Sequence, residues 1–390
     1  MHLADQKRLL ADVEAFCQEV RPVEELCYVE HRFNDQVLPL ARKHDLLGMI
    51  LPAAYGGRGA DTVTYVRALT RIGREGTGVR TFFSGHMSIG EYPILTWGNE
   101  EQKRRYLPAA GRGEKVLAFG LTEPDAGSNP LEMQMTYERR GDHFVLNGVK
   151  YLISNAGIAS TIVTFAYPKG RAGRISGFIL DTGGPGFACE DLLAKMGMPT
   201  SNTAMFELTN YAVPVANLLG QEGEGFRIAM GTLVSGRLSV AAGCLGVIED
   251  CLAEAVTYAK DRQQHGKAIA KHQLVQEHLA AIEMHRLASE SVVLRAAEAK
   301  DASNAEPADA ELRARADLLA AQAKLFAANA AWDAADRAVQ VFGGRGWSTL
   351  YRPGRHLQDV RVCRIYEGTD EILKLKVATA VLGKEYEAYK

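Results

Sequence analysis

The feature that most constrains the fold of this chain is a set of three long helical patterns in its second half. Residues 228–262, 272–300 and 308–341 are rich in Ala, Leu, Glu and Arg. Helices of about 30 residues are about 45 Å long, and helices of that length pack as a bundle. Residues 301–307 are the expected linker between the second and third helices. Alanine-rich faces predict burial against other subunits or within a closed monomeric bundle.

The middle of the chain has a different pattern, made of short apolar or alternating runs separated by glycine-rich turns. The expected strands cover residues 116–121, 143–146, 161–167, 176–180 and 203–208. Turn pairs such as Asn147-Gly148 punctuate them. Short strands at this spacing indicate a compact all-β unit.

The first third of the chain returns to helical periodicity. Residues 3–20 and 34–47 repeat apolar positions at intervals of three and four, and further helical stretches follow from Tyr65 and Glu100. The expected class is therefore α+β. An N-terminal helical domain (residues 1–114) precedes a β-barrel-like middle domain (115–225) and a C-terminal long four-helix bundle (226–390).

Charge and composition exclude several functions. A net charge of -2 gives no reason to expect a nucleic acid or an anionic membrane as a partner. We find no signal-peptide core and no continuous apolar run of 18 residues, so we expect no integral membrane association. Six cysteines without a CxxC pair favour a reduced, cytoplasmic location. The histidines at 265, 272, 278 and 285 lack metal-site spacing, so no metal is expected.

The strongest candidate for chemistry is the segment Tyr366-Glu367-Gly368-Thr369, which sets a carboxylate beside a glycine. A carboxylate in a water-poor pocket has a raised pKa, which suits it to remove a weakly acidic proton. Glycine lets the backbone approach a ligand closely. Taken alone, a Glu-Gly pair is more often a turn. Two other motifs change that balance, Leu-Thr-Glu-Pro-Asp-Ala-Gly-Ser at 121–128 and Gln-Val-Phe-Gly-Gly at 340–344.

In this order and at these separations the motifs resemble the acyl-CoA dehydrogenase flavoprotein family, nearest in pattern to its glutaryl-CoA dehydrogenase branch. The resemblance covers nearly the whole chain. It implies FAD-dependent α,β-dehydrogenation of an acyl-CoA, with Glu367 removing the α-proton and FAD taking a hydride from the β-carbon. It also implies a homotetramer that passes electrons to an electron-transferring flavoprotein. Some members place the base on the long helix instead, but residues 232–238 contain no carboxylate here.

The same resemblance implies where FAD is held, since GxGxxG is absent and a Rossmann site is excluded. Residues next to the flavin ring are Phe119, Leu121, Thr122, Ser128 and Ser154. A second set comprises Arg262, His265, His272 and Gln273, and a third, Gln340, Gly343 and Gly344, approaches the FAD of a neighbouring subunit. Thr369 and Glu371 match flavin contacts just after the base. Relatives often have an aromatic residue where Leu152 stands.

The substrate contacts implied by the resemblance are Arg80, Ser84, Ser128, Arg237, Tyr366 and Gly368. Arg80 is the most informative, because an arginine facing an acyl pocket would be costly without an anionic partner. A helix-end cation is the rival interpretation. We therefore expect a short acyl chain with a distal carboxylate or other anion. Gly73 stands where decarboxylating relatives tend to have an acid, so decarboxylation stays open.

Two alternative functions stay open on the same fold. One is dehydrogenation of an acyl group bound to a carrier protein in biosynthesis. The other is a flavin oxidase or monooxygenase, in which reduced flavin reacts with oxygen.

Overall fold

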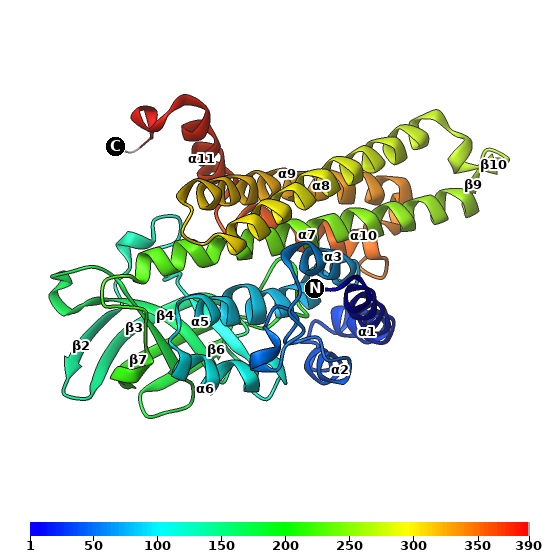
Figure 1. Cartoon of the computed structure of the whole chain (residues 1–390). Coiled ribbons are helices and arrows are strands. Elements are labelled where there is room, and N and C mark those ends of the chain that lie inside the picture. Colours follow the sequence, from blue (N-terminus) through cyan, green and yellow to red (C-terminus); the bar gives the residue numbers. More distant parts are fainter. Residues whose placement is uncertain (389–390) are drawn as a thin grey trace.

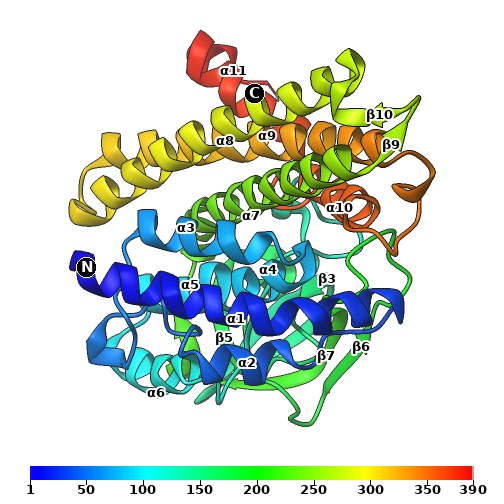
Figure 2. The ribbon, with the colours of Figure 1, turned by 90° about the vertical axis from the view of Figure 1, so that its right-hand side faces the viewer.

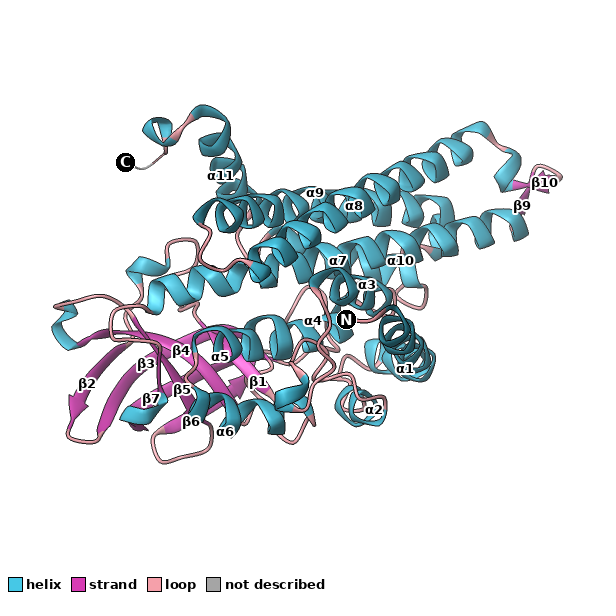
Figure 3. Ribbon diagram, viewed as in Figure 1, coloured by secondary structure: helices cyan, strands magenta, loops and turns pink. Residues whose placement is uncertain are grey.

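The computed structural model describes residues 1–388, which form three parts in chain order (Figures 1 and 3). The first part is helical, and its helices are α1 (Leu3–Val29), α2 (Val37–Lys43), α3 (Thr62–Gly73), α4 (Thr77–Phe83), α5 (Tyr92–Trp97) and α6 (Glu100–Gly111). A π-helical segment, Ser84–Glu91, joins α4 to α5. The helix expected over 34–47 is shorter than its apolar pattern, because α2 ends at Lys43.

The second part is a β-sheet. Its strands are β1 (Leu117–Gly120), β2 (Thr136–Arg140), β3 (His143–Ser154), β4 (Thr161–Pro168), β5 (Ser176–Asp181), β6 (Phe187–Asp191), β7 (Thr203–Pro214) and β8 (Leu218–Leu219). They are ordered β6-β7-β3-β2-β4-β5-β8, and β1 pairs in parallel with β4. Edge-to-face contacts of Phe178 with Tyr137 and Phe144, with ring centroids 5.0 and 5.2 Å apart, fill its core.

The turn predicted at Asn147-Gly148 is wrong, because both residues lie inside β3. The register between β3 and β7 shifts there, and Gly148 has a φ of 142°. A Cβ on Gly148 would lie 2.7 Å from the Met135 Cα. The glycine therefore marks a bulge and a close backbone approach, and no chain reversal.

The third part is dominated by three long helices, α7 (Gly225–Asp261), α8 (Gln273–Ala305) and α9 (Ala310–Phe342), followed by the shorter α10 (Arg352–Val360) and α11 (Asp370–Leu382). A small hairpin, β9 (Gln263–Gln264) and β10 (Lys267–Ala268), forms the tip between α7 and α8 (Figure 1). The order of helices, sheet and helices confirms the expected α+β class.

The linker expected at 301–307 is too long, because α8 continues to Ala305. Helix α8 extends through Asp301 because this residue makes a tertiary contact with the first part of the chain. The Asp301 carboxylate accepts hydrogen bonds from the backbone N–H groups of Thr62 and Val63, at 2.7 and 3.2 Å. These two N–H groups begin α3 and have no partner within their own helix. Asp301 thus extends α8 while it caps a helix of the first part.

Helix α7 lies between the other long helices and the N-terminal helices (Figure 2). By length and composition it could cross a membrane, although the sequence was expected to contain no such stretch. Its most apolar window is 78% buried inside the protein, as in a core helix. Glycines permit this packing. A Cβ on Gly246 would collide with the Thr70 carbonyl, and one on Gly73 would lie 2.7 Å from the Gly243 carbonyl oxygen.

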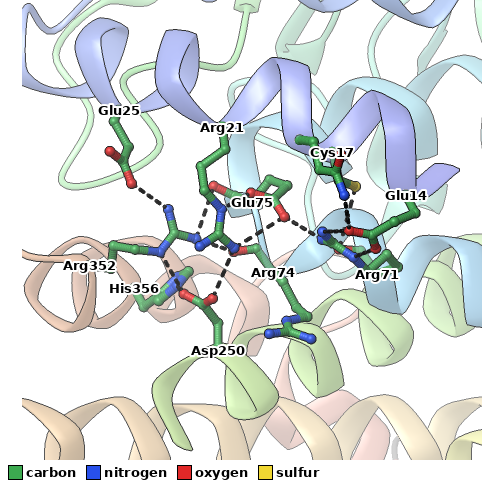
Figure 4. A network of polar contacts seen from close by, with 11 residues as sticks. Glu14, Cys17, Arg21, Glu25, Arg71, Arg74, Glu75, Asp250, Arg352 and His356 are labelled. Carbon is green, nitrogen blue, oxygen red and sulfur yellow. Dashed lines mark hydrogen bonds and ion pairs between the residues drawn. The ribbon is translucent and has the colours of Figure 1, made fainter. Parts of the chain in front are cut away.

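A buried network of charges joins α1, α3, α7 and α10 (Figure 4). Asp250 of α7 is at its centre. It accepts hydrogen bonds from Arg352 at 2.7 Å and from His356 at 2.8 Å, and it pairs with Arg21 at 3.3 Å. Burial alone would raise the pKa of Asp250, but the contacts with His356 and Arg352 outweigh it and hold the pKa well below its ordinary value. The carboxylate therefore stays charged in the fold.

Replacing this carboxylate should weaken the junction of the four helices. We expect Asp250→Asn to destabilise the protein by about 3 kcal/mol, because one partner of a buried ion pair is removed. Since the folded-state pKa is depressed, the stabilisation is present above the ordinary Asp range and is lost as the pH falls through the folded value. Denaturant unfolding at several pH values should show the difference from the parent shrinking in acid.

The matched control is Glu138→Gln, which breaks exposed pairs with Arg140 and Lys169. Exposed pairs contribute little, so its unfolding midpoint should match that of the parent. An Asp250→Asn protein that unfolds at the parent's midpoint would show that the network does not hold the helices together.

Candidate active site

The candidate site is built around Glu367, which lies in the turn before α11. Its φ of 57° places a non-glycine residue in the left-handed region, where the surroundings must hold it. The Oε2 atom is buried and accepts no hydrogen bond from any of residues 1–388. Burial raises the pKa of Glu367 to about 7, although Arg237 and Lys324 oppose this with positive charge. The site therefore holds a carboxyl group that is free to take a proton near neutral pH.

Helix α7 makes room for this carboxyl group at one glycine. A Cβ on Gly236 would lie 2.4 Å from the Glu367 Oε2 and 2.5 Å from its Oε1. The next residue, Arg237, donates from Nε to the Glu367 carbonyl at 3.2 Å and pairs through Nη1 with Asp317 at 2.9 Å. Gly236 thus gives space to the side chain of Glu367, while Arg237 holds its backbone.

The residues predicted for the acyl group lie beside this carboxyl. Arg80 is 1% exposed and donates to the Tyr366 hydroxyl. Its Nε has no hydrogen-bond partner, and it forms no ion pair with a carboxylate in the described chain. Ser84 hydrogen-bonds to Ser239, which donates to the Gly236 carbonyl at 2.8 Å. Arg80, Ser84, Arg237 and Tyr366 are therefore brought together around α7.

Two thiols that the sequence did not single out lie in the same place. The Cys363 Sγ is 3.2 Å from the Tyr366 hydroxyl. A hydrogen bond from Cys244, together with the positive charge of Arg80, lowers the pKa of Cys363. All six cysteines are free thiols. Cys363 thus lies beside the Tyr366 hydroxyl, to which the guanidinium of Arg80 also donates.

Two segments predicted to face the flavin ring lie side by side on the middle part. The Tyr151 N–H donates to the Thr122 carbonyl at 2.9 Å, which places Thr122 beside the strand that carries Ser154. Lys150 holds the segment 121–123 in place, because its Nζ donates hydrogen bonds to the Leu121 carbonyl at 3.1 Å and to the Glu123 carboxylate at 2.7 Å. Within residues 1–388, the hydroxyls of Thr122, Ser128 and Ser154 make no hydrogen bond. These hydroxyls are available to a ligand.

Phe119, the position of Leu152 and the two residues predicted to contact flavin just after the base are placed differently. Phe119 is packed in the core, with its ring 5.2 Å from that of Phe165. Leu152 has a φ of 58° and is 54% exposed at the irregular end of β3. Thr369 caps α11 by accepting from the Ile372 N–H at 3.3 Å, and Glu371 is exposed in the first turn of that helix.

The second and third flavin sets lie far from Glu367. Gly236 touches the Glu367 carboxyl, and Arg262 caps the same helix 26 residues later, which corresponds to about 39 Å. His265 and His272 lie beyond it on the β9–β10 tip (Figure 1), with ring centroids 6.2 Å apart. The buried Nε2 of His272 has no partner in the described chain. Gln273, which begins α8, lies at this tip, and Gln340, Gly343 and Gly344 lie at the far end of α9.

Comparison with known proteins agrees with this architecture. Profiles described as the N-terminal, middle and C-terminal domains of acyl-CoA dehydrogenase match residues 4–114, 118–211 and 223–382. An acyl-CoA dehydrogenase of Bacillus subtilis is 38% identical over 387 residues, 98% of this chain and 100% of that protein. This chain belongs to the acyl-CoA dehydrogenase family. It is an FAD-dependent oxidoreductase that acts on acyl-CoA thioesters.

The glutaryl-CoA branch is among the relatives but is not singled out. A glutaryl-CoA dehydrogenase of Desulfococcus multivorans is 35% identical over 356 residues, 90% of this chain and 89% of that protein. A solved butyryl-CoA dehydrogenase of Megasphaera elsdenii has a TM-score of 0.91 at 33% identity, covering 98% of this chain and 99% of its own. The expected family is confirmed, whereas the expected branch stays a proposal.

FAD is the cofactor of this family, and an acyl-CoA dehydrogenase of Bacillus anthracis was solved with it (TM-score 0.91, 32% identity, covering 98% of this chain and 67% of that one). The residues present fit such a group. The unengaged hydroxyls of Thr122 and Ser154 belong to neighbouring segments, and the His272 Nε2 is an orphaned buried atom at the tip. Among residues 1–388, no cluster of three or more His, Cys, Asp or Glu side chains could hold a metal ion.

Sequence reasoning missed Gly236 and Lys324. Gly236 interrupts a helix with a poor helix former, which was a usable signal. Lys324 stands among alanines, with Ala320 and Ala328 one turn away on either side, and all three are buried. A lysine on an alanine stripe is a signal of buried charge. Its partner, the Gly368 carbonyl, could not be read from spacing because it lies 44 residues away.

Adding one methyl group at Gly236 should separate activity from stability. In Gly236→Ala, the new Cβ would overlap the Glu367 carboxyl group, which must move, while alanine is the better helix former by roughly 1 kcal/mol. We expect reduction of the bound flavin by acyl-CoA to slow by about 10²-fold, with thermal stability kept. Stopped-flow spectroscopy and thermal unfolding measure the two quantities.

The control is Ser235→Ala, the neighbouring helical position, whose side chain makes no hydrogen bond in the described chain. It should reduce flavin at the parent's rate. A Gly236→Ala enzyme with unchanged flavin reduction would mean that the position of the Glu367 carboxyl beside α7 is unimportant.

Proposed function

We propose that this protein dehydrogenates a short acyl-CoA thioester, with Glu367 as the base and a preference for acyl groups that end in a carboxylate or another anion. The observation that carries the proposal is the Glu367 carboxyl group. Its Oε2 is unpartnered, and burial raises its pKa to about 7. Such a group is a stronger base than an ordinary glutamate and has a free lone pair for the incoming proton.

The chemistry follows from these positions. Glu367 accepts the α-proton through its unpartnered oxygen and becomes the neutral acid, which its buried surroundings favour. Arg237 keeps the turn in place by binding the carbonyl oxygen of the same residue. FAD, when bound, supplies the acceptor for the hydride that leaves the β-carbon. The acyl thioester thereby becomes the α,β-enoyl thioester.

Removing the proton acceptor tests the proposal directly. Glu367→Gln keeps the shape of the side chain, so the variant should still bind FAD and acyl-CoA. Flavin reduction should slow by at least ~10³-fold, within the range for loss of a general base. In the parent, the rate of reduction should rise with pH through about 7, because only the deprotonated carboxylate accepts a proton.

The control is Glu311→Gln, an exposed carboxylate in the first turn of α9, which should change neither the rate nor its pH dependence. Near-normal flavin reduction by Glu367→Gln would place the base elsewhere. A purified protein that binds no FAD would contradict the assignment of the flavin contacts.

The proposed substrate preference rests on the environment of Arg80. Its guanidinium is buried without a carboxylate partner, an arrangement that is costly unless an anion arrives. A Cβ on Gly243 would lie 2.6 Å from the Arg80 Nε, and Gly243 is seven residues beyond Gly236, or about 10 Å along α7. That spacing suits an acyl chain of only a few carbons between Glu367 and the guanidinium.

Exchange of this arginine should reverse the choice of substrate. We expect the parent to favour glutaryl-CoA over butyryl- and hexanoyl-CoA by roughly 10²–10³-fold in kcat/KM, because a plain alkyl chain leaves the cation unpaired. Arg80→Met should remove or reverse this preference while FAD stays bound. Mass analysis of the products would also show whether carbon dioxide is lost.

The control for this prediction is Arg104→Met, which removes an exposed arginine of α6. Its selectivity should equal that of the parent. If the parent prefers the uncharged chains, the Arg80 cation is structural and the anionic preference is wrong, whereas the dehydrogenase activity is unaffected by that result.

We further propose that the flavin contacts are split between two chains. Phe119, Leu121, Thr122, Ser128, Ser154, Thr369 and Glu371 would serve the flavin of their own chain. The remaining predicted contacts lie too far from Glu367 to reach the flavin of their own chain. They are Arg262, His265, His272, Gln273, Gln340, Gly343 and Gly344. Their place at the far ends of the long helices supports a homotetramer in which they contact a neighbour's FAD.

The proposed electron acceptor is an electron-transferring flavoprotein. In support, a chain in a solved structure described as the electron transferring flavoprotein of Acidaminococcus fermentans has a TM-score of 0.92 at 36% identity, covering 98% of this chain and 99% of its own. We also propose a cytoplasmic location, which the six free thiols support.

A further inference from the structure

The turn that carries Glu367 has an unfavourable backbone conformation. Glu367 has a φ of 57° and Gly368 a φ of 96°, so two successive residues are left-handed. Glycine adopts this region freely, but for glutamate it is disfavoured and must be maintained by contacts. The direction of the carboxyl group depends on this conformation. Whatever holds the two peptide units therefore sets the geometry of the base.

Two cations bind the carbonyl oxygens of the turn. Arg237 of α7 donates to the Glu367 carbonyl at 3.2 Å, and Lys324 of α9 donates from Nζ to the Gly368 carbonyl at 2.7 Å. After the turn, Arg364 and Asn329 both bind the Asp370 carboxylate at 2.9 Å. The conformation is thus held by contacts from two helices, α7 and α9.

Lys324 differs from Arg237 in having no acid within ion-pair distance in the described chain. Arg237 pairs with Asp317, whereas Lys324 is 0% exposed and forms no ion pair in the described chain. The Gly368 carbonyl is its one hydrogen-bond acceptor there. An ammonium group buried on an alanine-rich face is costly, and burial lowers its pKa. Stability alone would favour an apolar residue at this position, so the lysine points to a functional requirement.

We propose that Lys324 is a positioning residue for the base, holding the left-handed turn through the Gly368 carbonyl so that Glu367 faces the substrate. This inference rests on the proposed role of Glu367. Lys324 acts through the backbone of the neighbouring residue and touches neither the reacting carbons nor the flavin. Its positive charge has a second effect, because it stabilises the ionised form of Glu367 and opposes the rise in pKa that burial causes.

Other charges act on the same pair of residues. Arg80 and Arg237 also lower the pKa of Glu367. Cys363, Asp370 and Cys244 act on Lys324 and favour its charged form. Since all of these groups stay in place when Lys324 alone is changed, a shift in the pH profile of that variant reports the lysine.

The experiment compares two substitutions of Lys324 in the FAD-loaded protein. Lys324→Met removes the hydrogen bond and the charge, whereas Lys324→Gln can still donate to the Gly368 carbonyl but carries no charge. Anaerobic stopped-flow reduction by acyl-CoA across pH gives the rate and its apparent pKa. Amide hydrogen exchange of residues 363–372 in the same proteins, without substrate, reports whether the turn is held.

For Lys324→Met we expect faster exchange in the turn, reduction slowed by about 10²-fold, little change in KM, and an apparent pKa above that of the parent. For Lys324→Gln we expect exchange close to the parent's and a partial recovery of rate, with the raised apparent pKa retained. If Lys324→Met does not retain FAD, the Lys324→Gln variant alone tests the positioning role. The apparent pKa of flavin reduction in that variant does not depend on how much of the protein folds.

The matched control is Lys300→Met, which removes a buried lysine of α8 whose Nζ donates to the Tyr92 hydroxyl at 2.6 Å. Its rate and pH profile should equal those of the parent. Parent-like exchange, rate and apparent pKa in both Lys324 variants would overturn the inference. Glu367→Gln, run in parallel, separates the two proposals. If it also reduces flavin normally, the assignment of the base has failed, and if only the Lys324 variants are normal, only the positioning role has failed.

Discussion

Close packing against one face of α7 is the constraint on which the rest of the structure depends. Three positions on this helix lack a side chain because something else fills the space. The Glu367 carboxyl lies against Gly236, the Arg80 side chain against Gly243, and the α3 backbone against Gly246. Gly243 and Gly246 are one turn apart, and Gly236 is two turns before Gly243. The base, the buried cation and the N-terminal part are thereby aligned along a single rigid element.

The architecture could be predicted because its signals are local and periodic. Three long alanine-rich patterns became α7, α8 and α9, and the short runs that precede α7 became a sheet. The errors came where a distant contact overrides the local pattern. Gly148 looked like a turn residue, but a glycine is required there because the backbone of Met135 lies close to it. The end of α8 depends on Asp301, which caps α3. Neither partner can be inferred from neighbours in sequence.

The site shows the same division. The motif around Glu367 marked the carboxylate, and the resemblance marked Arg80 and Tyr366, which the structure brings into contact. The contacts that govern Glu367 come from α7 and α9, more than forty residues away in the chain. Spacing carries no information about such pairs. The sequence also could not show that this carboxylate lies against Gly236, which about 39 Å of helix α7 separate from Arg262 near the β9–β10 tip.

The space at Gly236 also bears on how such enzymes diverge. Because a side chain at position 236 would enter the volume now filled by the Glu367 carboxyl, two separate chain segments have access to one location for the base. A lineage that gained an acid on the helix could lose the one in the turn without moving the substrate or the flavin. The glycine is required only while the turn supplies the carboxylate. The fold thus fixes where the proton is removed, whereas the residue that supplies the carboxylate can change over evolutionary time.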